Sequence, residues 1–250
     1  NDKDAPKNKS LFGGQQSDLA GVLLDGRYRL LEPLAEGGMG TVWRARHELM
    51  RREVAVKILP TSLQKVSKHV ESFKREIDTI CELDHPNIVE LYDAGFDARV
   101  GHYAAMRMLK GKDLATRITS GPALTILEIL SIAEQTGRAL DACHNRQIIH
   151  RDVKPENVFL GEDPQSPSGW SVRMLDFGVS MFVEQAASRA GGGKPNSVAG
   201  TPYTMSPEQI RGRRLDARTD IYSFGILLFE LFTGRYPFNP NSVNDLLRMQ

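Results

Sequence analysis

The sequence has few cysteines, almost no net charge and no long apolar run, and each absence argues against a class of protein. Cys81 and Cys143 are too few for a disulfide framework, so we expect a reducing compartment and two small core residues. Lys and Arg number 32 against 31 Asp and Glu, a formal charge of +1, which disfavours a protein whose main task is gripping nucleic acid. The longest apolar stretch, residues 221–232, is interrupted by Glu230 and is too short to span a membrane.

The length and the polar start of the chain bound its organisation. With 250 residues and 40% apolar side chains, it can bury the core of one or two domains. It opens with Asn1, and no charged start is followed by an apolar run, so we expect no secretory signal and interpret the chain as a segment of a longer protein. Residues 1–27 are mostly polar without a periodic apolar face, which predicts a flexible leader and places the start of order at Tyr28.

Three strand-like runs open the folded part, at residues 28–34, 41–46 and 54–59. A glycine cluster separates the first two runs, so we expect a hairpin with a flexible tip. In the third run, the period of two puts Ala55 and Lys57 on one face and branched residues on the other. This alternation predicts a strand that is covered on one face only.

A helix is expected after the third strand, because apolar residues recur at steps of three and four between Val66 and Ile80. Short runs at residues 88–92 and 102–106 resemble strands. They complete a small, mostly β lobe that ends near Leu109.

Helices dominate the rest of the chain. Residues 125–128 spell a capping box, and the segment after it to Cys143 is apolar on nearly all sides, as expected of a helix in the middle of a core. Residues 220–232 show the same pattern. Between these helices, residues 158–160 and 172–175 indicate two short strands joined by an enlarged loop.

Three residue types in the first lobe suit a bound phosphate. Gly37, Gly38 and Gly40 stand at the hairpin tip, where backbone N–H groups can approach an anion, although an ordinary flexible turn is the alternative. Lys57 offers a positive charge to such a phosphate, or else it lies in solvent like most strand lysines. Glu76 lies at the edge of the apolar helical stripe, where it either reaches inward to Lys57 or stays exposed.

The segment His-Arg-Asp-Val-Lys-Pro-Glu-Asn at residues 150–157 concentrates several reactive side chains. Asp152 is able to accept a proton, Lys154 to neutralise charge on a transferred group, and Asn157 to offer its carbonyl oxygen to a hard cation. Asp176, in an Asp-Phe-Gly turn, supplies a second oxygen ligand. Two oxygen ligands together with bound phosphates suit Mg²⁺.

In this combination and order, the motifs resemble those of the protein kinases, most closely the eukaryotic-like Ser/Thr kinases of bacteria. The resemblance extends from Tyr28 to Gln250. Its motifs are the glycine loop, Val54-Ala-Val-Lys57, Glu76, His150 to Asn157, Asp176-Phe-Gly178, Ser206-Pro-Glu208 and Asp220. It implies an α+β, bilobal protein-kinase-like fold, with a β-rich N-terminal lobe over residues 28–109. A mainly helical C-terminal lobe over residues 110–250 would be incomplete and end near the family's αG region.

The resemblance also implies a role for each site residue. Asp152 receives the proton of the substrate hydroxyl with Lys154 beside it, and Lys57 contacts the α- and β-phosphates of ATP while paired to Glu76. The residues implied to bind ATP are Leu34, Gly37, Gly38, Gly40, Val42, Ala55, Lys57, Met106, Arg107, Leu109 and Phe159. The residues implied to hold Mg²⁺, with Mn²⁺ as an alternative, are Asn157 and Asp176.

The substrate class and a switch follow from the same resemblance. Lys154 and Thr201 fit the pattern of Ser/Thr-specific kinases, so protein Ser and Thr hydroxyls are the expected acceptors. The segment after Asp176 looks like an activation loop, whose autophosphorylation at Ser197 or Thr201 would set negative charge against Arg151. Self-association for phosphorylation in trans, no nucleic-acid partner and a cytoplasmic catalytic domain are also implied, with a membrane tether outside this segment left open.

Two departures from the family pattern and one histidine carry further expectations. Ala35 stands where the family usually has its first glycine, which removes backbone freedom from the loop. In the family, the glutamate equivalent to Glu208 pairs with an arginine from helices that would follow Gln250. His150 is expected to have a structural role rather than to act as a base.

Two rival functions differ from that of a protein kinase. A pseudokinase would bind ATP and only scaffold partners, and loss of Lys57, Asp152 or Asp176 would favour it, but all three are present. A small-molecule kinase of the same fold is disfavoured by Lys154 and by the substrate platform expected at residues 200–208.

Overall fold

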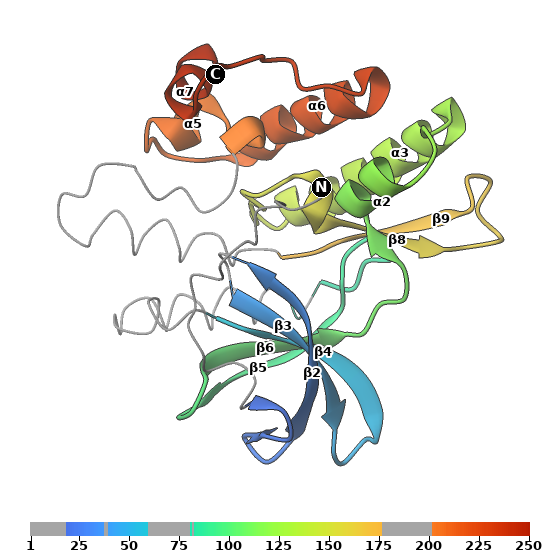
Figure 1. Ribbon diagram of the computed structural model, residues 1–250, viewed down its shortest axis with the longest axis vertical. Helices are drawn as coiled ribbons and strands as arrows, with labels where there is room; N and C mark the ends of the chain where they lie inside the picture. The colour runs from blue at the N-terminus through green and yellow to red at the C-terminus, as the bar shows by residue number, and fades with distance from the viewer. Residues whose placement is uncertain (1–18, 38–39, 60–80, 82, 177–201) are drawn as a thin grey trace, which may run out of the picture.

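The computed structural model describes residues 19–37, 40–59, 81, 83–176 and 202–250 of the chain. These residues form two lobes, one built on an antiparallel sheet and the other mainly helical (Figure 1). The expectation of an α+β, bilobal fold is therefore confirmed.

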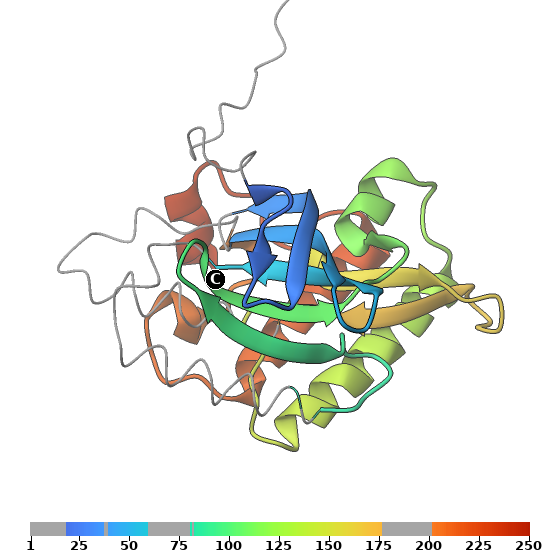
Figure 2. The ribbon, with the colours of Figure 1, turned by 90° about the horizontal axis from the view of Figure 1, so that it is seen from below.

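The N-terminal lobe is a six-stranded antiparallel sheet in the order β1-β2-β3-β4-β6-β5. Its strands are β1 (Leu23–Leu24), β2 (Tyr28–Gly37), β3 (Gly40–His47), β4 (Arg52–Ile58), β5 (Leu91–Asp97) and β6 (Gly101–Arg107). The sheet is strongly twisted (Figure 2) and surrounds an apolar core in which Trp43 and Tyr103 are the largest side chains. The strands expected at residues 28–34, 41–46 and 102–106 are confirmed.

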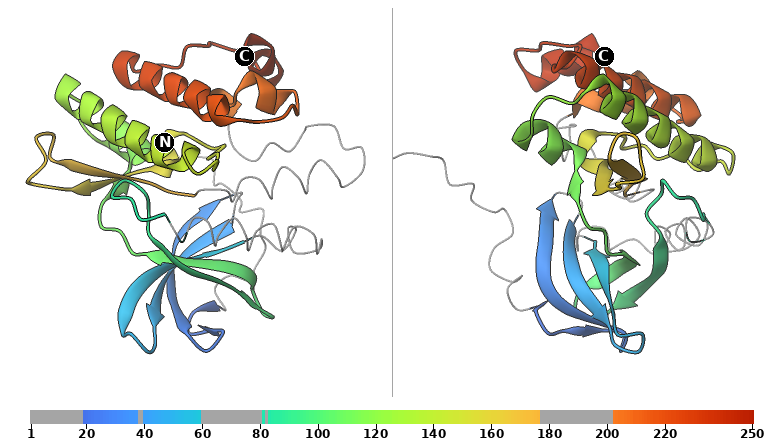
Figure 3. Two further views of the ribbon diagram at one scale, coloured as in Figure 1. Left: turned by 180° about the vertical axis from the view of Figure 1, so that it is seen from behind. Right: turned by 90° about the vertical axis from the view of Figure 1, so that its right-hand side faces the viewer.

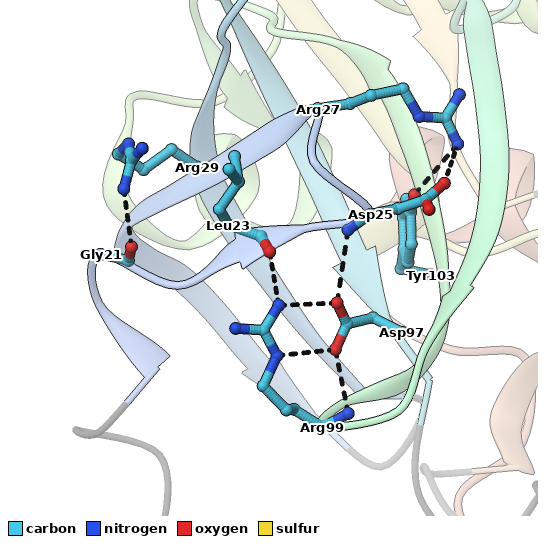
Figure 4. Close-up of polar contacts among 8 residues, drawn as sticks. All are labelled: Gly21, Leu23, Asp25, Arg27, Arg29, Asp97, Arg99 and Tyr103. Atoms are coloured by element: carbon cyan, nitrogen blue, oxygen red, sulfur yellow. Dashed lines mark hydrogen bonds and ion pairs between the residues drawn. The ribbon is translucent and has the colours of Figure 1, made fainter.

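The folded sheet begins earlier than the sequence indicates, because residues 19–27 lie on it rather than in a leader. Strand β1 pairs with β2, and the turn between β5 and β6 holds β1 in place (Figure 4). Arg99 donates a hydrogen bond to the carbonyl of Leu23, and Asp97 accepts one from the backbone N–H of Asp25 at 3.3 Å. A two-residue strand has no periodicity of its own, so the sequence pattern gave no sign of it.

Strand β4 is buried on both faces, so the expectation of a strand covered on one face is wrong. Val54 and Val56 are fully buried in the sheet's core. On the other face, Ala55 is 8% exposed and Lys57 is 3% exposed. This face packs against residues of the second lobe, Leu175 among them, and the alternation of side chains alone does not reveal such a cover.

The strand expected at residues 88–92 starts later, at Leu91. Ile88 instead forms an isolated parallel bridge with Met174, and the N–H of Val89 donates to the carbonyl of Met174 at 3.0 Å. The backbone hydrogen bonds of this segment therefore go to the second lobe and tie the two lobes together.

Helices α3 (Ile126–His144) and α6 (Ala217–Thr233) form the centre of the C-terminal lobe. The shorter helices are α2 (Leu114–Ser120), α5 (Pro207–Ile210) and α7 (Val243–Met249). The predicted capping box opens α3: the Thr125 hydroxyl accepts from the N–H of Glu128, and the Glu128 carboxylate accepts from the N–H of Thr125. Among the described residues, no helix is both long and apolar enough to cross a membrane.

Both long helices are buried along one face, not on nearly all sides as expected. On α3, Ile126 and Leu130 are exposed, and on α6 Ile221 and Phe232 are exposed. An apolar count therefore overestimates how much of each helix is covered. The expectation for the cysteines is half wrong, because Cys143 is buried on α3 whereas Cys81 is exposed.

A second sheet lies between α3 and the N-terminal lobe (Figure 3). It consists of β7 (Lys112–Asp113), β8 (Val158–Glu162) and β9 (Trp170–Met174), paired antiparallel in this order. Residues 163–169 form the enlarged loop that was predicted between two short strands. The 3₁₀ helices η3 (Pro155–Asn157) and η4 (Pro202–Thr204) lead into β8 and α5.

Candidate active site

The tip of the β2–β3 hairpin carries the glycines expected to bind phosphate. Gly37 pairs with Gly40 across the tip. Gly40 has a φ of 116°, and a Cβ there would lie 2.1 Å from the Ile58 carbonyl oxygen, so only glycine fits. Ala35 is different, because it pairs with Val42 as an ordinary strand residue and does not have a positive φ. The backbone therefore does not need a glycine at this position.

Lys57 of β4 meets Asp176, the residue two positions after β9, across the junction of the lobes. Its Nζ lies 2.7 Å from Oδ2 of Asp176, and the two side chains are 4% and 22% exposed. An ion pair this well shielded from water is screened much less than one on the surface. Asp176 also holds a left-handed backbone conformation, with a φ of 60°. Such strained backbone persists only where the surrounding structure fixes it, as at functional sites.

An apolar patch adjoins this ion pair. Ala55 and Met106 are buried in it, and Val42, Leu109 and Leu175 pack against them. The patch combines strands of the first lobe with the segment that follows β9. It thus brings together four of the residues expected to contact ATP, and a flat purine ring suits such a surface.

Two other residues expected to contact ATP lie at the margin of this patch. Leu34 occupies an irregularity in the β2–β3 register, between Pro33 and Ala35, and is 45% exposed. Phe159 of β8 is half-buried and lines a cavity together with Arg107 and Leu109.

The connection from β6 to β7 carries the backbone groups expected to bind the adenine edge. The N–H of Arg107 is already used, because it donates to the Glu90 carbonyl at 2.9 Å. The N–H of Leu109 makes no backbone hydrogen bond among the described residues, so this donor is open to a ligand. Gly111 has a φ of 143°, and a Cβ there would lie 2.0 Å from the Leu160 carbonyl oxygen. Glycine thus lets the connection cross closely over β8.

Asp152, Lys154 and Asn157 form one hydrogen-bonded group. The Nζ of Lys154 lies 2.8 Å from Oδ2 of Asp152. The Nδ2 of Asn157 donates to the same oxygen at 2.8 Å and to the Asp152 carbonyl at 2.7 Å. Since both amide hydrogens of Asn157 are used, its Oδ1 is the atom left to accept from a donor or to bind a cation.

Backbone hydrogen bonds join this group to the Lys57–Asp176 pair. The N–H of Leu175 donates to the Asn157 carbonyl at 2.9 Å, and the carbonyl of Leu175 lies 2.8 Å from Nε2 of His150. Asp176, the next residue, is therefore held beside the loop that carries Asp152. Side chains from three separate segments of the sequence, around Lys57, Asp152 and Asp176, thus converge at one place.

Asp220 of α6 anchors the loop and is itself fully buried. Its carboxylate accepts from the backbone N–H groups of His150 at 2.8 Å and Arg151 at 2.7 Å. The Nε2 of His144 lies 2.8 Å from the same carboxylate. Burial opposes ionisation, but these hydrogen bonds outweigh it and lower the pKa of Asp220. Asp220 therefore stays charged and fixes the backbone immediately before Asp152.

His150 is fully buried and has both ring nitrogens engaged. Its Nε2 lies 2.8 Å from the Leu175 carbonyl, and its Nδ1 accepts from the N–H of Asp152 at 3.3 Å. Since a carbonyl can only accept, Nε2 is the donor in its hydrogen bond to Leu175. This bonding agrees with the structural role expected for His150.

The sequence reasoning missed one support of the loop and one contact of the neighbouring helix α5. Gln209 caps α5 together with Ser206, and its Nε2 also donates to the Arg151 carbonyl at 2.7 Å. The Thr219 hydroxyl donates to Glu208 at 2.7 Å, at the residue for which the resemblance implied an arginine partner. The capping-box spacing of Ser206 and Gln209 could have located the helix start, but nothing in it points to the loop.

The site supplies oxygen ligands rather than a complete metal cage. In the part of the chain that the structure describes, no three His, Cys, Asp or Glu side chains gather to hold a metal ion. Asp176 and the Oδ1 of Asn157 are two hard oxygen donors, and a cation bound to them needs phosphate oxygens or water to complete its shell. These residues therefore fit a divalent cation that arrives with phosphates.

Several expectations fall on residues outside the described ranges. They are the leader over residues 1–18, the helix over residues 66–80, and Gly38, Glu76, Phe177, Gly178, Ser197 and Thr201. The pairing of Lys57 with Glu76 and the phosphorylation sites stay predictions.

The chain is similar in sequence to known proteins. Residues 28–250 match the protein kinase domain family. The chain is 38% identical over 220 residues to the serine/threonine-protein kinase pkn2 of Myxococcus xanthus. It is 37% identical over 224 residues to PrkC of Bacillus subtilis and 35% identical over 226 residues to PknA of Mycobacterium tuberculosis. The alignments cover 87%, 90% and 89% of this chain but only 26%, 33% and 50% of those proteins.

Proposed function

Because the chain belongs to the protein kinase domain family, we propose that it transfers the γ-phosphoryl group of ATP to serine and threonine hydroxyls of proteins. The observation that carries the proposal is the 2.7 Å contact between Lys57 and Asp176, beside the loop of Asp152. The relatives of this chain are named serine/threonine-protein kinases, which supports serine and threonine hydroxyls as the acceptors.

The chemistry proceeds at Asp152. Its carboxylate accepts the proton of the substrate hydroxyl as the hydroxyl oxygen attacks the γ-phosphorus, and the bond from this phosphorus to the β,γ-bridging oxygen breaks, so that ADP leaves. Asn157 holds the carboxylate in place. Lys154, 2.8 Å from the carboxylate, neutralises charge that builds up on the transferred group. Positioning and charge neutralisation thus supply most of the catalysis.

The other half of the site binds the nucleotide. Lys57 contacts the α- and β-phosphates, the glycine hairpin covers them, and the patch around Ala55 holds the adenine, whose edge accepts from the N–H of Leu109. Asn157 and Asp176 would hold Mg²⁺, or Mn²⁺ in its place, and the cation would neutralise negative charge on the phosphates.

Autophosphorylation in trans is proposed as the switch. Arg151 has a buried Nε without a hydrogen-bond partner in the described structure, which supports its role as a donor to an activation-loop phosphate. The use of ATP supports a cytoplasmic position for this domain.

The test is a transfer assay with radiolabelled ATP and a general protein substrate. We expect label on serine and threonine after phosphoamino acid analysis, and at least a hundredfold less transfer by Asp152→Asn. Equal transfer by the wild type and Asp152→Asn would contradict the proposal and favour a nucleotide-dependent scaffold. Label on tyrosine alone would contradict the proposed acceptor.

A further inference from the structure

A cavity of about 300 Å³ lies between the connection of the two lobes and the β8–β9 hairpin. It is lined by residues 107–110 and by Phe159, Gly161, Glu162, Ser171 and Arg173. The cavity shares Arg107, Leu109 and Phe159 with the residues expected to bind ATP, whereas Asp152 and Lys57 are not among its lining residues, so it adjoins the nucleotide site without including the catalytic group.

The strand register explains why the cavity exists. Phe159 pairs with Arg173, and Gly161 pairs with Ser171, so these four residues share one face of the hairpin. The opposite face, with Val158, Leu160, Val172 and Met174, is fully buried in the core of the C-terminal lobe. Gly161 and Ser171 lie between the long side chains of Phe159 and Arg173 and the hairpin loop. Because both residues are small, they leave a hollow under the connection of the two lobes.

The cavity has an excess of positive charge. Arg107, Lys110 and Arg173 line it, against the single carboxylate of Glu162. Arg107 lies 3.7 Å from Glu90, and both of these side chains are more than half exposed. Within the described residues, neither Lys110 nor Arg173 forms an ion pair with a carboxylate. Two of the three cations thus form no ion pair within the described residues.

Arg173 is the most fixed of the three cations. Its Nη1 donates to the carbonyl of Pro86 at 2.6 Å, which holds the guanidinium in place. Burial lowers the pKa of Arg173, and the positive charge of Arg107 lowers it further while Glu90 opposes the shift. An arginine stays charged at neutral pH regardless, so a bound anion would reduce the repulsion between the two guanidinium groups beyond what Glu90 already offsets.

We propose that this cavity binds a phosphorylated serine or threonine side chain of a protein substrate. A phosphate carries nearly two negative charges at neutral pH and three acceptor oxygens, which suit two guanidinium groups and one ammonium group. A carboxylate carries one charge and two oxygens, so it leaves more of this positive charge unpaired. The inference rests on the proposed function for the source of its ligand, because a Ser/Thr kinase makes phosphoserine and phosphothreonine.

A substrate bound here would be anchored outside the catalytic loop. An earlier phosphorylation would then raise the local concentration of the next hydroxyl at Asp152. The enzyme therefore prefers proteins that are already phosphorylated, through a lower KM with little change in kcat.

The test measures binding by fluorescence anisotropy, with no ATP present. The probes are fluorescein-labelled nonapeptides of alanine and glycine with phosphothreonine, glutamate or threonine at the centre. We expect the phosphothreonine peptide to bind at least tenfold more tightly than the glutamate peptide, and the threonine peptide not to bind. Lys110→Gln and Arg173→Gln should each weaken phosphopeptide binding about tenfold, the effect of one lost charge-assisted hydrogen bond.

Arg46→Gln is the matched control, because it removes the same charge from an exposed position on β3 and should leave binding unchanged. Arg173→Gln also loses the bond to Pro86, so if that variant unfolds, Lys110→Gln decides. Equal affinities for the phosphothreonine and glutamate peptides would overturn the phosphate assignment. Equal weakening by Arg46→Gln and Lys110→Gln would overturn the assignment to this cavity. Since no ATP is used, a failure here is distinct from a failure of phosphoryl transfer.

Discussion

The two lobes position their functional residues by different means. In the N-terminal lobe, the residues expected to bind ATP are placed by strand register: Lys57 of β4 stands opposite Val42 of β3 and Ala104 of β6. In the C-terminal lobe, the loop of Asp152 has little regular structure. It is held in place by hydrogen bonds to side chains, and the carboxylate of the buried Asp220 accepts two of them from the loop backbone.

This difference teaches where each half is vulnerable. Strand register is shared among many backbone hydrogen bonds, so single substitutions outside the cleft should leave Lys57 in place. The catalytic loop depends on a few buried polar groups, and removal of one leaves its partners unsatisfied in a low-dielectric surrounding. Substitutions that touch no substrate should therefore damage the C-terminal half more than the N-terminal half.

The largest effect is expected from Asp220→Ala. It removes the acceptor of two backbone N–H groups next to Asp152, so we predict at least a hundredfold lower kcat with little change in ATP affinity. Transfer assays and nucleotide titrations on the same samples separate the two effects. Asp141→Ala, at an exposed position on α3, is the control. Full activity in Asp220→Ala would show that the loop does not depend on this anchor.

A large effect on stability is expected from Glu128→Gln. Burial opposes ionisation of Glu128, but hydrogen bonds from Thr125, Trp170 and Arg117 lower its pKa to about 2. Because folding lowers this pKa, the ionised carboxylate stabilises the fold fully at a pH above the ordinary pKa of 4.5. This stabilisation is lost as the pH falls toward 2. The variant should lose about 2 kcal/mol in urea unfolding at pH 7.

As the pH falls from about 5 to about 3, where this carboxylate titrates, the same variant should lose less stability than the wild type. Glu134→Gln, an exposed position on the same helix, serves as the control. Parallel pH profiles for Glu128→Gln and the wild type would contradict the role of this carboxylate.

A smaller effect is expected in the N-terminal lobe from Arg99→Gln. The variant loses the hydrogen bond to the Leu23 carbonyl and the ion pair with Asp97 that hold β1. Because the arginine is about half exposed, we predict a small loss of unfolding free energy and an unchanged kcat. Hydrogen exchange at Leu24 should report the loosened strand. Unchanged protection there would show that the strand does not need Arg99.

The smallest effect is expected from Ala35→Gly. Since Ala35 already fits an ordinary strand, glycine relieves no strain and only adds conformational freedom to the unfolded chain. We predict a loss of about 0.5–1 kcal/mol in stability and no gain in ATP affinity. A clear gain in affinity or rate would mean that the alanine does hinder the hairpin tip.

The sequence predicted the strands better than it predicted which surfaces are covered. Short strand-like runs located β2, β3, β4 and β6, because such runs are a local signal. Covered surfaces were not predictable, as the second face of β4 and the exposed apolar residues of α3 show. Both depend on what packs against an element, and a local pattern does not contain that information.

The candidate site shows the same limit. The residue types of Asp152, Lys154 and Asn157 pointed to their chemistry from the sequence alone, because charged and amide groups so close together are rare in a loop. The support from Gln209 was not visible, because its contact with the Arg151 carbonyl joins two segments 58 positions apart. Residue types thus indicate what a site does, and tertiary contacts determine what holds it in place.

The most direct test of the converging site is ATP affinity measured by calorimetry with and without Mg²⁺. The account predicts that Mg²⁺ strengthens binding to the wild type, that Asp176→Asn abolishes this gain, and that Lys57→Gln weakens binding under both conditions. If Asp176→Asn kept the full gain from Mg²⁺, the lysine and the aspartate would not share one nucleotide site.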